Sequence, residues 1–203
     1  MAKLKRVSEY KSKSKKAIIL GKGNSLFKYK YSSEDIVFSL NTAGMHLNKL
    51  SFLIMNDIET IFKFKESKKL NIIENIICPI QPHKNCWISN FTYLNLLDLL
   101  KDENINIFTY NLQTQRIKVK DERIDDFKLR VKPLSSLHTA IQFLPLLEFE
   151  NVSIYGCSKN KEYSKVFVNS NDTGSKREES WYKENNQMAI DMLKFYKINH
   201  IFN

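Results

Sequence analysis

The chain has 203 residues, of which 42% are hydrophobic and 12% aromatic, enough to bury the core of one ordinary domain. Its formal charge of +10 is unevenly spread: residues 1–30 contain ten Lys and Arg against one acid, whereas the remainder contains 22 basic and 21 acidic residues. Three cysteines are too few for a disulfide framework, and no Cys/His spacing matches a zinc site. Because no apolar run could cross a membrane and no secretory signal follows the basic start, we expect a cytoplasmic protein.

Short apolar runs alternate with longer amphipathic stretches after a polar, basic lead at residues 1–15. The runs end at turn or amide residues, as buried parallel strands do. We expect strands at residues 17–20, 36–40, 52–55, 72–77, 105–110, 152–155 and 198–202. Apolar residues recur at helical spacing over residues 91–100, 137–147 and 188–196. The alternation predicts a single Rossmann-like α/β domain at residues 16–203, with a doubly wound and mainly parallel sheet.

Two polar stretches interrupt this alternation. Residues 111–130 mix acidic and basic side chains and are typical of an insertion or a small hairpin. Residues 158–180 are dominated by Lys, Asn, Ser and acidic residues, and we predict a polar lid loop there. Such a loop would lie beside the end of the strand at residues 152–155.

The first expected strand is followed by Gly-Lys-Gly-Asn-Ser-Leu at residues 21–26. Gly21 and Gly23 allow a sharp turn and a close approach to a ligand, and Ser25 could cap a helix whose free N–H groups favour an anion. The segment is neither a P-loop nor a dinucleotide fingerprint, because it lacks the closing Gly-Lys-Ser/Thr and the third glycine. A phosphate-binding turn and a simple tight turn both remain open.

Polar residues follow the next two strands at the edge where doubly wound sheets bind ligands. Asn41 and Asn56 are either turn formers or amides that hydrogen-bond a base, a ribose or a sugar hydroxyl. Asp57 and Glu59 could hold Mg²⁺ against a diphosphate, but capping of the following helix is favoured. We therefore expect no metal cofactor.

The helix after Pro133 begins with polar residues that would face the same edge. Ser135 or Ser136 would cap this helix, whose start forms a second possible anion site. His138 is the candidate catalytic residue, although a lone histidine is more often a hydrogen-bonded part of the core. Trp181 and Tyr182 either anchor the last helix or stack on a base or sugar. No Ser/His/Asp order or H-E-x-x-H pattern supports a hydrolase.

Together these features resemble the family 42 bacterial sialyltransferases, and the wider Rossmann-like group that includes 6-hydroxymethylpterin pyrophosphokinase-like proteins. The sialyltransferase motif Gly-Asn-Gly-Pro-Ser-Leu is similar to residues 21–26, and both chains continue with strands ending in Asn, a Ser-led helix and a strand followed by Gly. The resemblance covers residues 16–56 and 133–203. This chain departs from the family at two positions. Ser158 stands where the family has an acid, and the residues near Ser180 stand where the family has its catalytic histidine.

The resemblance implies a metal-independent glycosyltransferase that binds a CMP-sugar and transfers the sugar to an acceptor hydroxyl, on a glycan or a nucleic acid. It implies that Gly21, Gly23 and Ser25 cradle the phosphate. It implies further that Asn41 and Asn56 hold the ribose and sugar, and that Ser136 lies on the cytidine side. The full predicted nucleotide-binding set is Gly21, Gly23, Asn24, Ser25, Asn41, Asn56, Ser135, Ser136 and Gly156.

Two other functions remain open besides a glycosyltransferase. The first is a non-catalytic protein that binds a nucleotide or a nucleic acid in the same crevice, with the basic segment at residues 1–15 contacting an acidic surface. The basic segment could equally be a solubilising tail. The second alternative is a pyrophosphokinase-like transferase.

Overall fold

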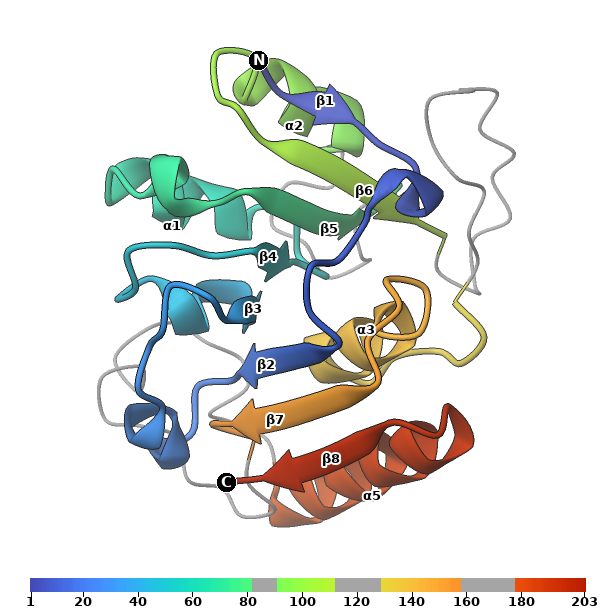
Figure 1. Cartoon of the computed structure of the whole chain (residues 1–203). Helices are drawn as coiled ribbons and strands as arrows, with labels where there is room; N and C mark the ends of the chain where they lie inside the picture. Colours follow the sequence, from blue (N-terminus) through green and yellow to red (C-terminus); the bar gives the residue numbers. More distant parts are fainter. Residues whose placement is uncertain (82–90, 112–128, 158–177) are drawn as a thin grey trace.

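A computed structural model describes residues 1–81, 91–111, 129–157 and 178–203 of the chain. Its strands form one eight-stranded sheet in the order β1-β6-β5-β4-β3-β2-β7-β8, and every neighbouring pair is parallel (Figure 1). The strands are β1 (Lys3–Leu4), β2 (Lys16–Leu20), β3 (Ile36–Leu40), β4 (Phe52–Ile54), β5 (Asn75–Pro79), β6 (Asn106–Tyr110), β7 (Asn151–Tyr155) and β8 (Asn199–Phe202). The Rossmann-like, doubly wound sheet expected from the sequence is confirmed.

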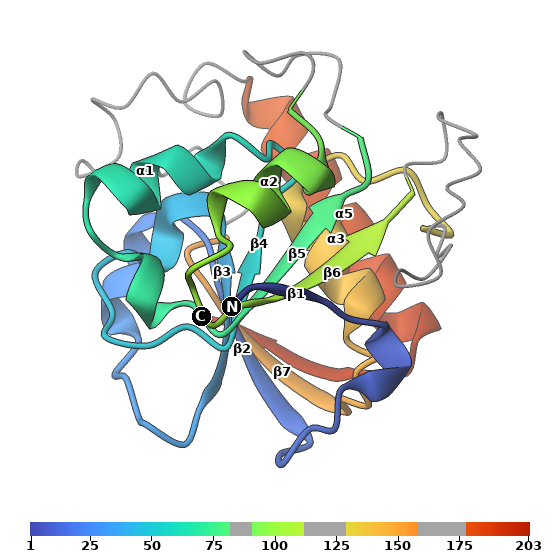
Figure 2. The same ribbon diagram turned by 90° about the horizontal axis from the view of Figure 1, so that it is seen from above.

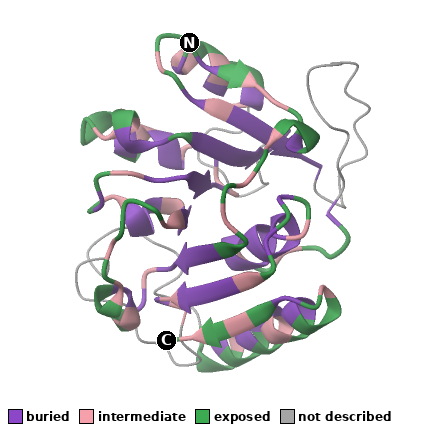
Figure 3. Ribbon diagram, viewed as in Figure 1, coloured by how far each residue is buried: buried purple, intermediate pink, exposed green. Residues whose placement is uncertain are grey.

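Helices cover both faces of the sheet (Figure 2). On one face lie α1 (Thr60–Glu66) and α2 (Tyr93–Leu99), and on the other lie α3 (Ser136–Phe143) and α5 (Glu179–Phe195). Short 3-10 helices occur at η1 (Val7–Glu9), η2 (Asn24–Lys28), η3 (Asn41–Gly44) and η4 (Leu70–Ile72). Successive residues of a strand point to opposite faces, so Ile18 packs into the core beneath α1 and α2, and Ile19 into the core beneath α3 and α5. The central strands are buried almost throughout (Figure 3).

The order of the strands reverses beside β2. From β2 the chain moves to β3, β4, β5 and β6 on one side, and then crosses back to place β7 and β8 on the other. Ligands of doubly wound sheets bind outside the carboxyl ends of the strands at such a switch point. The ends of β2, β3 and β7 are therefore the part of the fold where a site is expected.

Part of the basic segment at residues 1–15 belongs to the sheet. The strand β1 pairs with β6, and the side chains of Ala2 and Val7 are buried. The ring of Tyr10 packs edge-on against Phe52 with 5.0 Å between ring centroids. The expectation that the basic segment is a solubilising tail is therefore wrong for residues 2–10.

Several element boundaries differ from the expectation. The last helix, α5, begins at Glu179 and includes Trp181 and Tyr182, which were expected to precede a helix with Glu184 in its first turn. Strand β5 begins at Asn75, and η4 ends at Ile72, the first residue of the expected strand. The predicted lid at residues 158–180 lies outside the described residues up to 177, and so does most of the predicted insertion at 111–130. Among the helices of the described ranges, none has both the length and the apolar character that a membrane crossing requires.

Candidate functional site

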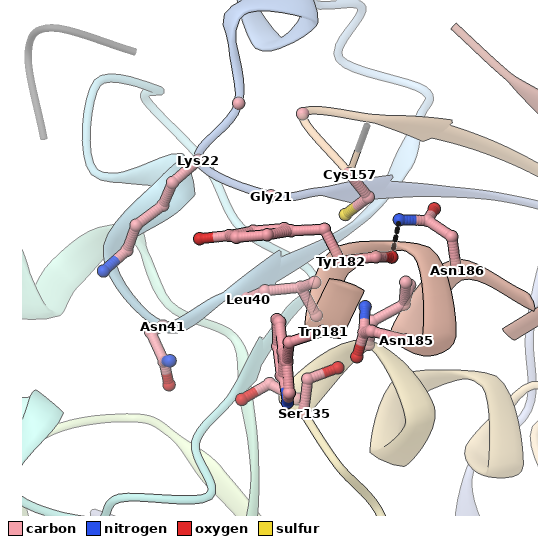
Figure 4. A pocket seen from close by; sticks show the side chains of 14 residues that line it. Gly21, Lys22, Leu40, Asn41, Ser135, Cys157, Trp181, Tyr182, Asn185 and Asn186 are labelled. Carbon is pink, nitrogen blue, oxygen red and sulfur yellow. Dashed lines mark hydrogen bonds between the residues drawn. The ribbon is translucent and has the colours of Figure 1, made fainter. Parts of the chain in front are cut away.

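An open pocket of about 130 Å³ lies at the switch point (Figure 4). Its walls come from the turn after β2, the end of β3, the start of α3, the end of β7 and the first two turns of α5. Six of the nine predicted nucleotide-binding residues line it, namely Gly21, Gly23, Asn41, Ser135, Ser136 and Gly156. Asn24, Ser25 and Asn56 are absent from the lining.

The two strand ends beside the pocket contact each other through their main chains. The N–H of Gly21 donates to the carbonyl of Tyr155 at 2.7 Å, and the N–H of Gly23 donates to the carbonyl of Gly156 at 2.8 Å. Gly156 has a φ of 68°, in the left-handed region that favours glycine. Both N–H groups already have acceptors within the protein, so they are not free to donate to a phosphate, and the cradle at Gly21 and Gly23 stays a prediction.

Ser25 also links these two segments, and its contact with a ligand stays a prediction. Its Oγ accepts a hydrogen bond from the N–H of Gly156 at 2.8 Å. The residue lies inside η2, whose N-cap is Gly23, so the predicted role of Ser25 as a helix cap is wrong. Asn24, next to it, is exposed to solvent outside the pocket lining.

The two asparagines at the strand ends have different surroundings. Asn41 lines the pocket with a φ of 52°, and its buried Oδ1 has no hydrogen-bond partner in the described part of the protein (Figure 4). The Oδ1 of Asn56 accepts hydrogen bonds from the hydroxyls of Tyr110 at 2.8 Å and Thr139 at 2.9 Å. The Oδ1 of Asn56 therefore links the end of β4 to β6 and α3, and Asn56 lies outside the pocket lining, so its contact with a ligand stays a prediction.

Two further buried oxygens in the pocket lack partners within the described residues. Ser135 is the N-cap of α3, yet its side chain makes no capping hydrogen bond and its buried Oγ is unpartnered. The Oδ1 of Asn185, one turn further along α5 than Trp181, is unpartnered as well. A buried polar atom without a partner costs about 1–3 kcal/mol. With Asn41, three such atoms line one pocket, and they match the donors of a polar ligand.

His138 connects two helices and does not line the pocket. Its side chain is completely buried, and its Nδ1 accepts a hydrogen bond from the N–H of Leu134 at 3.1 Å. Nε2 lies 2.8 Å from the carbonyl oxygen of Asn185, and must donate there because a carbonyl only accepts. Burial lowers the pKa of His138, and its hydrogen bond to Asn185 opposes that shift. With both nitrogens engaged, this histidine is unsuited to the catalytic role suggested for it.

Other lining residues add one charge, a thiol and two rings. Lys22 carries the only charge among the described lining residues, and its side chain extends over the pocket toward Asn41 (Figure 4). Burial raises the pKa of the Cys157 thiol to about 12, so this group is protonated at neutral pH. Trp181 and Tyr182 both line the pocket from the first turn of α5, with their rings edge to face at 5.2 Å.

The carboxylates considered as a metal site lie elsewhere. Asp57 and Glu59 precede α1 and are not part of the pocket lining. Asp57 was expected to cap this helix, but the N-cap residue of α1 is Glu59, which makes no side-chain capping hydrogen bond. Across the described ranges, no three His, Cys, Asp or Glu residues are grouped as metal ligands would be.

Asn185 and Asn186 also line the pocket, although no expected motif includes them. Both lie in α5, and the Nδ2 of Asn186 donates to the carbonyl of Tyr182 at 3.0 Å (Figure 4). The buried positions Tyr182, Asn185, Asn186 and Ala189 do follow helical spacing. The helical spacing of buried positions was therefore present in the sequence, but two of these positions are amides rather than apolar residues.

No family model matches the sequence, and comparisons with curated proteins and with solved structures give no match. The site is therefore interpreted from its own chemistry. The described lining offers amide and hydroxyl oxygens, one ammonium group and two aromatic rings, and it contains no carboxylate or imidazole.

Proposed function

We propose that this pocket binds a nucleotide or nucleotide-sugar, and that the protein is a glycosyltransferase-like protein for which a CMP-sugar is the favoured donor. The observation that carries the proposal is the set of three buried, unpartnered oxygens on Asn41, Ser135 and Asn185. Amino groups of a base and hydroxyls of a ribose or sugar are the donors that would satisfy them. A ligand with several such donors gains most from this lining.

One end of the pocket carries positive groups that would attract the phosphate of the ligand. The first N–H groups of α3 have no partners within the helix, and Ser135 and Ser136 bring this helix start to the pocket. Lys22 adds a positive charge on the opposite wall, and no described lining residue adds a negative one. A phosphate or diphosphate therefore meets attraction without a metal ion.

The aromatic residues support a planar component of the ligand. Trp181 is half-buried at the pocket wall, whereas Tyr182 is 7% exposed. A partly exposed indole beside amide acceptors suits stacking on a base. Of the two roles considered for this pair, anchoring fits Tyr182 and stacking fits Trp181.

A second candidate function, nucleotide binding without catalysis, is favoured by one specific observation. Transfer to a hydroxyl normally uses a general base, which contributes about 10²–10⁴-fold to the rate. The described lining residues supply none, because His138 is sequestered and Cys157 stays protonated. The pyrophosphokinase-like alternative gains no comparable support, since Asp57 and Glu59 lie outside the pocket lining.

Titration calorimetry with CMP, UMP, GMP and AMP tests the binding proposal, and incubation with CMP-sialic acid tests transfer. Binding of CMP in preference to the purine nucleotides, with release of CMP from the sugar donor in the presence of an acceptor glycan, is the result expected for the transferase. Binding without CMP release identifies the non-catalytic candidate. Absence of binding by all nucleotides and sugar donors contradicts both.

A further inference from the structure

A second surface lies at the opposite end of the same strands, at the amino ends of β2, β7 and β8. The register aligns Lys16 with Asn151 and Asn151 with Asn199, so these three side chains form a row on one face of the sheet. The next row on that face pairs Ser153 with Ile201. These rows form the floor of an open groove of about 710 Å³. The groove lies where the end of α5 leads into β8.

Two lysines from the end of α5 complete the groove. Lys194 lies in the last turn of the helix, and Lys197 follows it with a φ of 56°. Lys16, Lys194 and Lys197 are all exposed, and none forms an ion pair with a carboxylate within the described residues. Among the described residues, the groove lining contains three lysines and no acidic residue.

The basic stretch of the sequence leads directly into this groove. The carbonyl of Lys15 accepts hydrogen bonds from the N–H groups of Glu150 at 2.9 Å and Asn151 at 3.0 Å, which holds Lys15 at the amino end of β7. Lys11 and Lys13, earlier in the chain, are exposed, and Lys15 pairs with Glu150 at 3.5 Å. Lys15 and Lys16 thus bring part of the basic segment to this end of the sheet.

We propose that this groove binds the phosphate backbone of a nucleic acid. Lysines, asparagine and serine side chains and free backbone N–H groups are the groups that contact phosphate and sugar. The groove provides the first three, and β8 is an edge strand with one side of its backbone unpaired in the described sheet. A concave lining rich in amides fits a strand of backbone better than it fits a flat membrane surface. The site is separate from the nucleotide pocket and does not depend on it.

Fluorescence anisotropy with a labelled 20-nucleotide RNA, its DNA equivalent and a DNA duplex tests the proposal. The triple variant Lys16→Gln/Lys194→Gln/Lys197→Gln should weaken binding by at least about tenfold and reduce the slope of log affinity against log salt by about 2. The chain offers a matched control in Lys63→Gln/Lys65→Gln/Lys68→Gln. Those lysines are exposed on and after α1, and Lys68 has a φ of 55° like that of Lys197.

The control variant removes the same charge from another face, so it should retain most of the wild-type affinity. Preference among the three probes identifies RNA, single-stranded DNA or duplex as the ligand. The proposal is overturned if no probe binds at 50 mM salt, if both triple variants lose affinity equally, or if CMP competes with the probe. Sedimentation with phosphatidylserine vesicles, lost in the groove variant while nucleic acids do not bind, would also overturn it.

Discussion

Gly21 and Gly156 face each other main chain to main chain at the ends of β2 and β7. A Cβ atom on either residue would overlap the carbonyl oxygen of the other. The hydrogen bonds of Gly21 to Tyr155 and of Gly23 to Gly156 hold the same two segments together. These glycines therefore fix the width of the pocket through the backbone, and this requirement holds with or without a ligand.

Alanine at either of the two facing glycines should destabilise the fold. Gly156→Ala and Gly21→Ala should each lower the free energy of unfolding by about 1–3 kcal/mol, because the added methyl group has no space. Urea denaturation measures this, with Asn24→Ala in the same turn as a control that changes stability by less than about 0.5 kcal/mol. Full stability of both glycine variants would show that the strand ends can separate freely.

Alanine substitution of two serines near the pocket should have opposite effects on stability and on CMP affinity. Ser25→Ala removes the acceptor of the Gly156 N–H and should cost about 1 kcal/mol of stability. Ser135→Ala removes a hydroxyl without a partner, so stability should stay nearly constant while affinity for CMP falls. Calorimetry and denaturation on both variants separate the two effects. Equal affinity losses would show that Ser25 also contacts the ligand.

The asparagines at the strand ends provide a second pair of opposite effects. Asn56→Ala leaves the hydroxyls of Tyr110 and Thr139 without their acceptor and should cost about 2 kcal/mol. Asn41→Gly removes the unpartnered amide yet tolerates the φ of 52°, so it should weaken CMP binding about tenfold with little change in stability. If Asn41→Gly bound CMP like the wild type, Asn41 would be only a turn former.

Acid should destabilise the protein through His138. Because burial lowers the pKa of His138 below its ordinary 6.5, the unfolded chain binds this proton more readily than the folded chain. The free energy of unfolding should therefore fall as the pH decreases from about 6.5 toward the folded-state pKa, and stay level above this range. Urea denaturation between pH 7.5 and 5 should show a shallower decline for His138→Gln.

A second histidine provides the control for this pH effect. Burial also lowers the pKa of His46, which lies outside α3, so His46→Gln should remove only its own share of the decline. The double variant should be flatter than either single one. An unchanged pH dependence in His138→Gln would contradict the assignment of a neutral, fully hydrogen-bonded imidazole.

The strands that position the pocket could be predicted because each is a continuous apolar run. Ile36–Leu40 matches the expectation residue for residue, and β2 and β7 each begin one residue early. Strand β1 was not predicted, because Lys3–Leu4 is short and basic and is stabilised by a partner about a hundred residues away. Pairing over such a separation leaves no local pattern in the sequence.

A residue of the site could be predicted from the sequence only where its place at the end of a strand is enough to bring it to the pocket. Asn41 reaches the pocket, but Asn56 does not. The hydroxyls of Thr139 on α3 and Tyr110 on β6 donate hydrogen bonds to the Oδ1 of Asn56 instead. That difference depends on packing between elements distant in the sequence. Asn185 was missed for a related reason, since the first half of α5 turns amides rather than apolar residues toward the protein.

The central claim is that the unpartnered oxygens of Asn41, Ser135 and Asn185 receive the donors of a nucleotide. Titration of CMP into the wild type and into Asn41→Gly/Ser135→Ala/Asn185→Ala, both shown to be folded, tests it most directly. We expect the wild type to bind and the triple variant to lose about 100-fold in affinity, since three hydrogen bonds of about 1 kcal/mol each disappear. Equal binding by the two proteins, or none by the wild type, would contradict it.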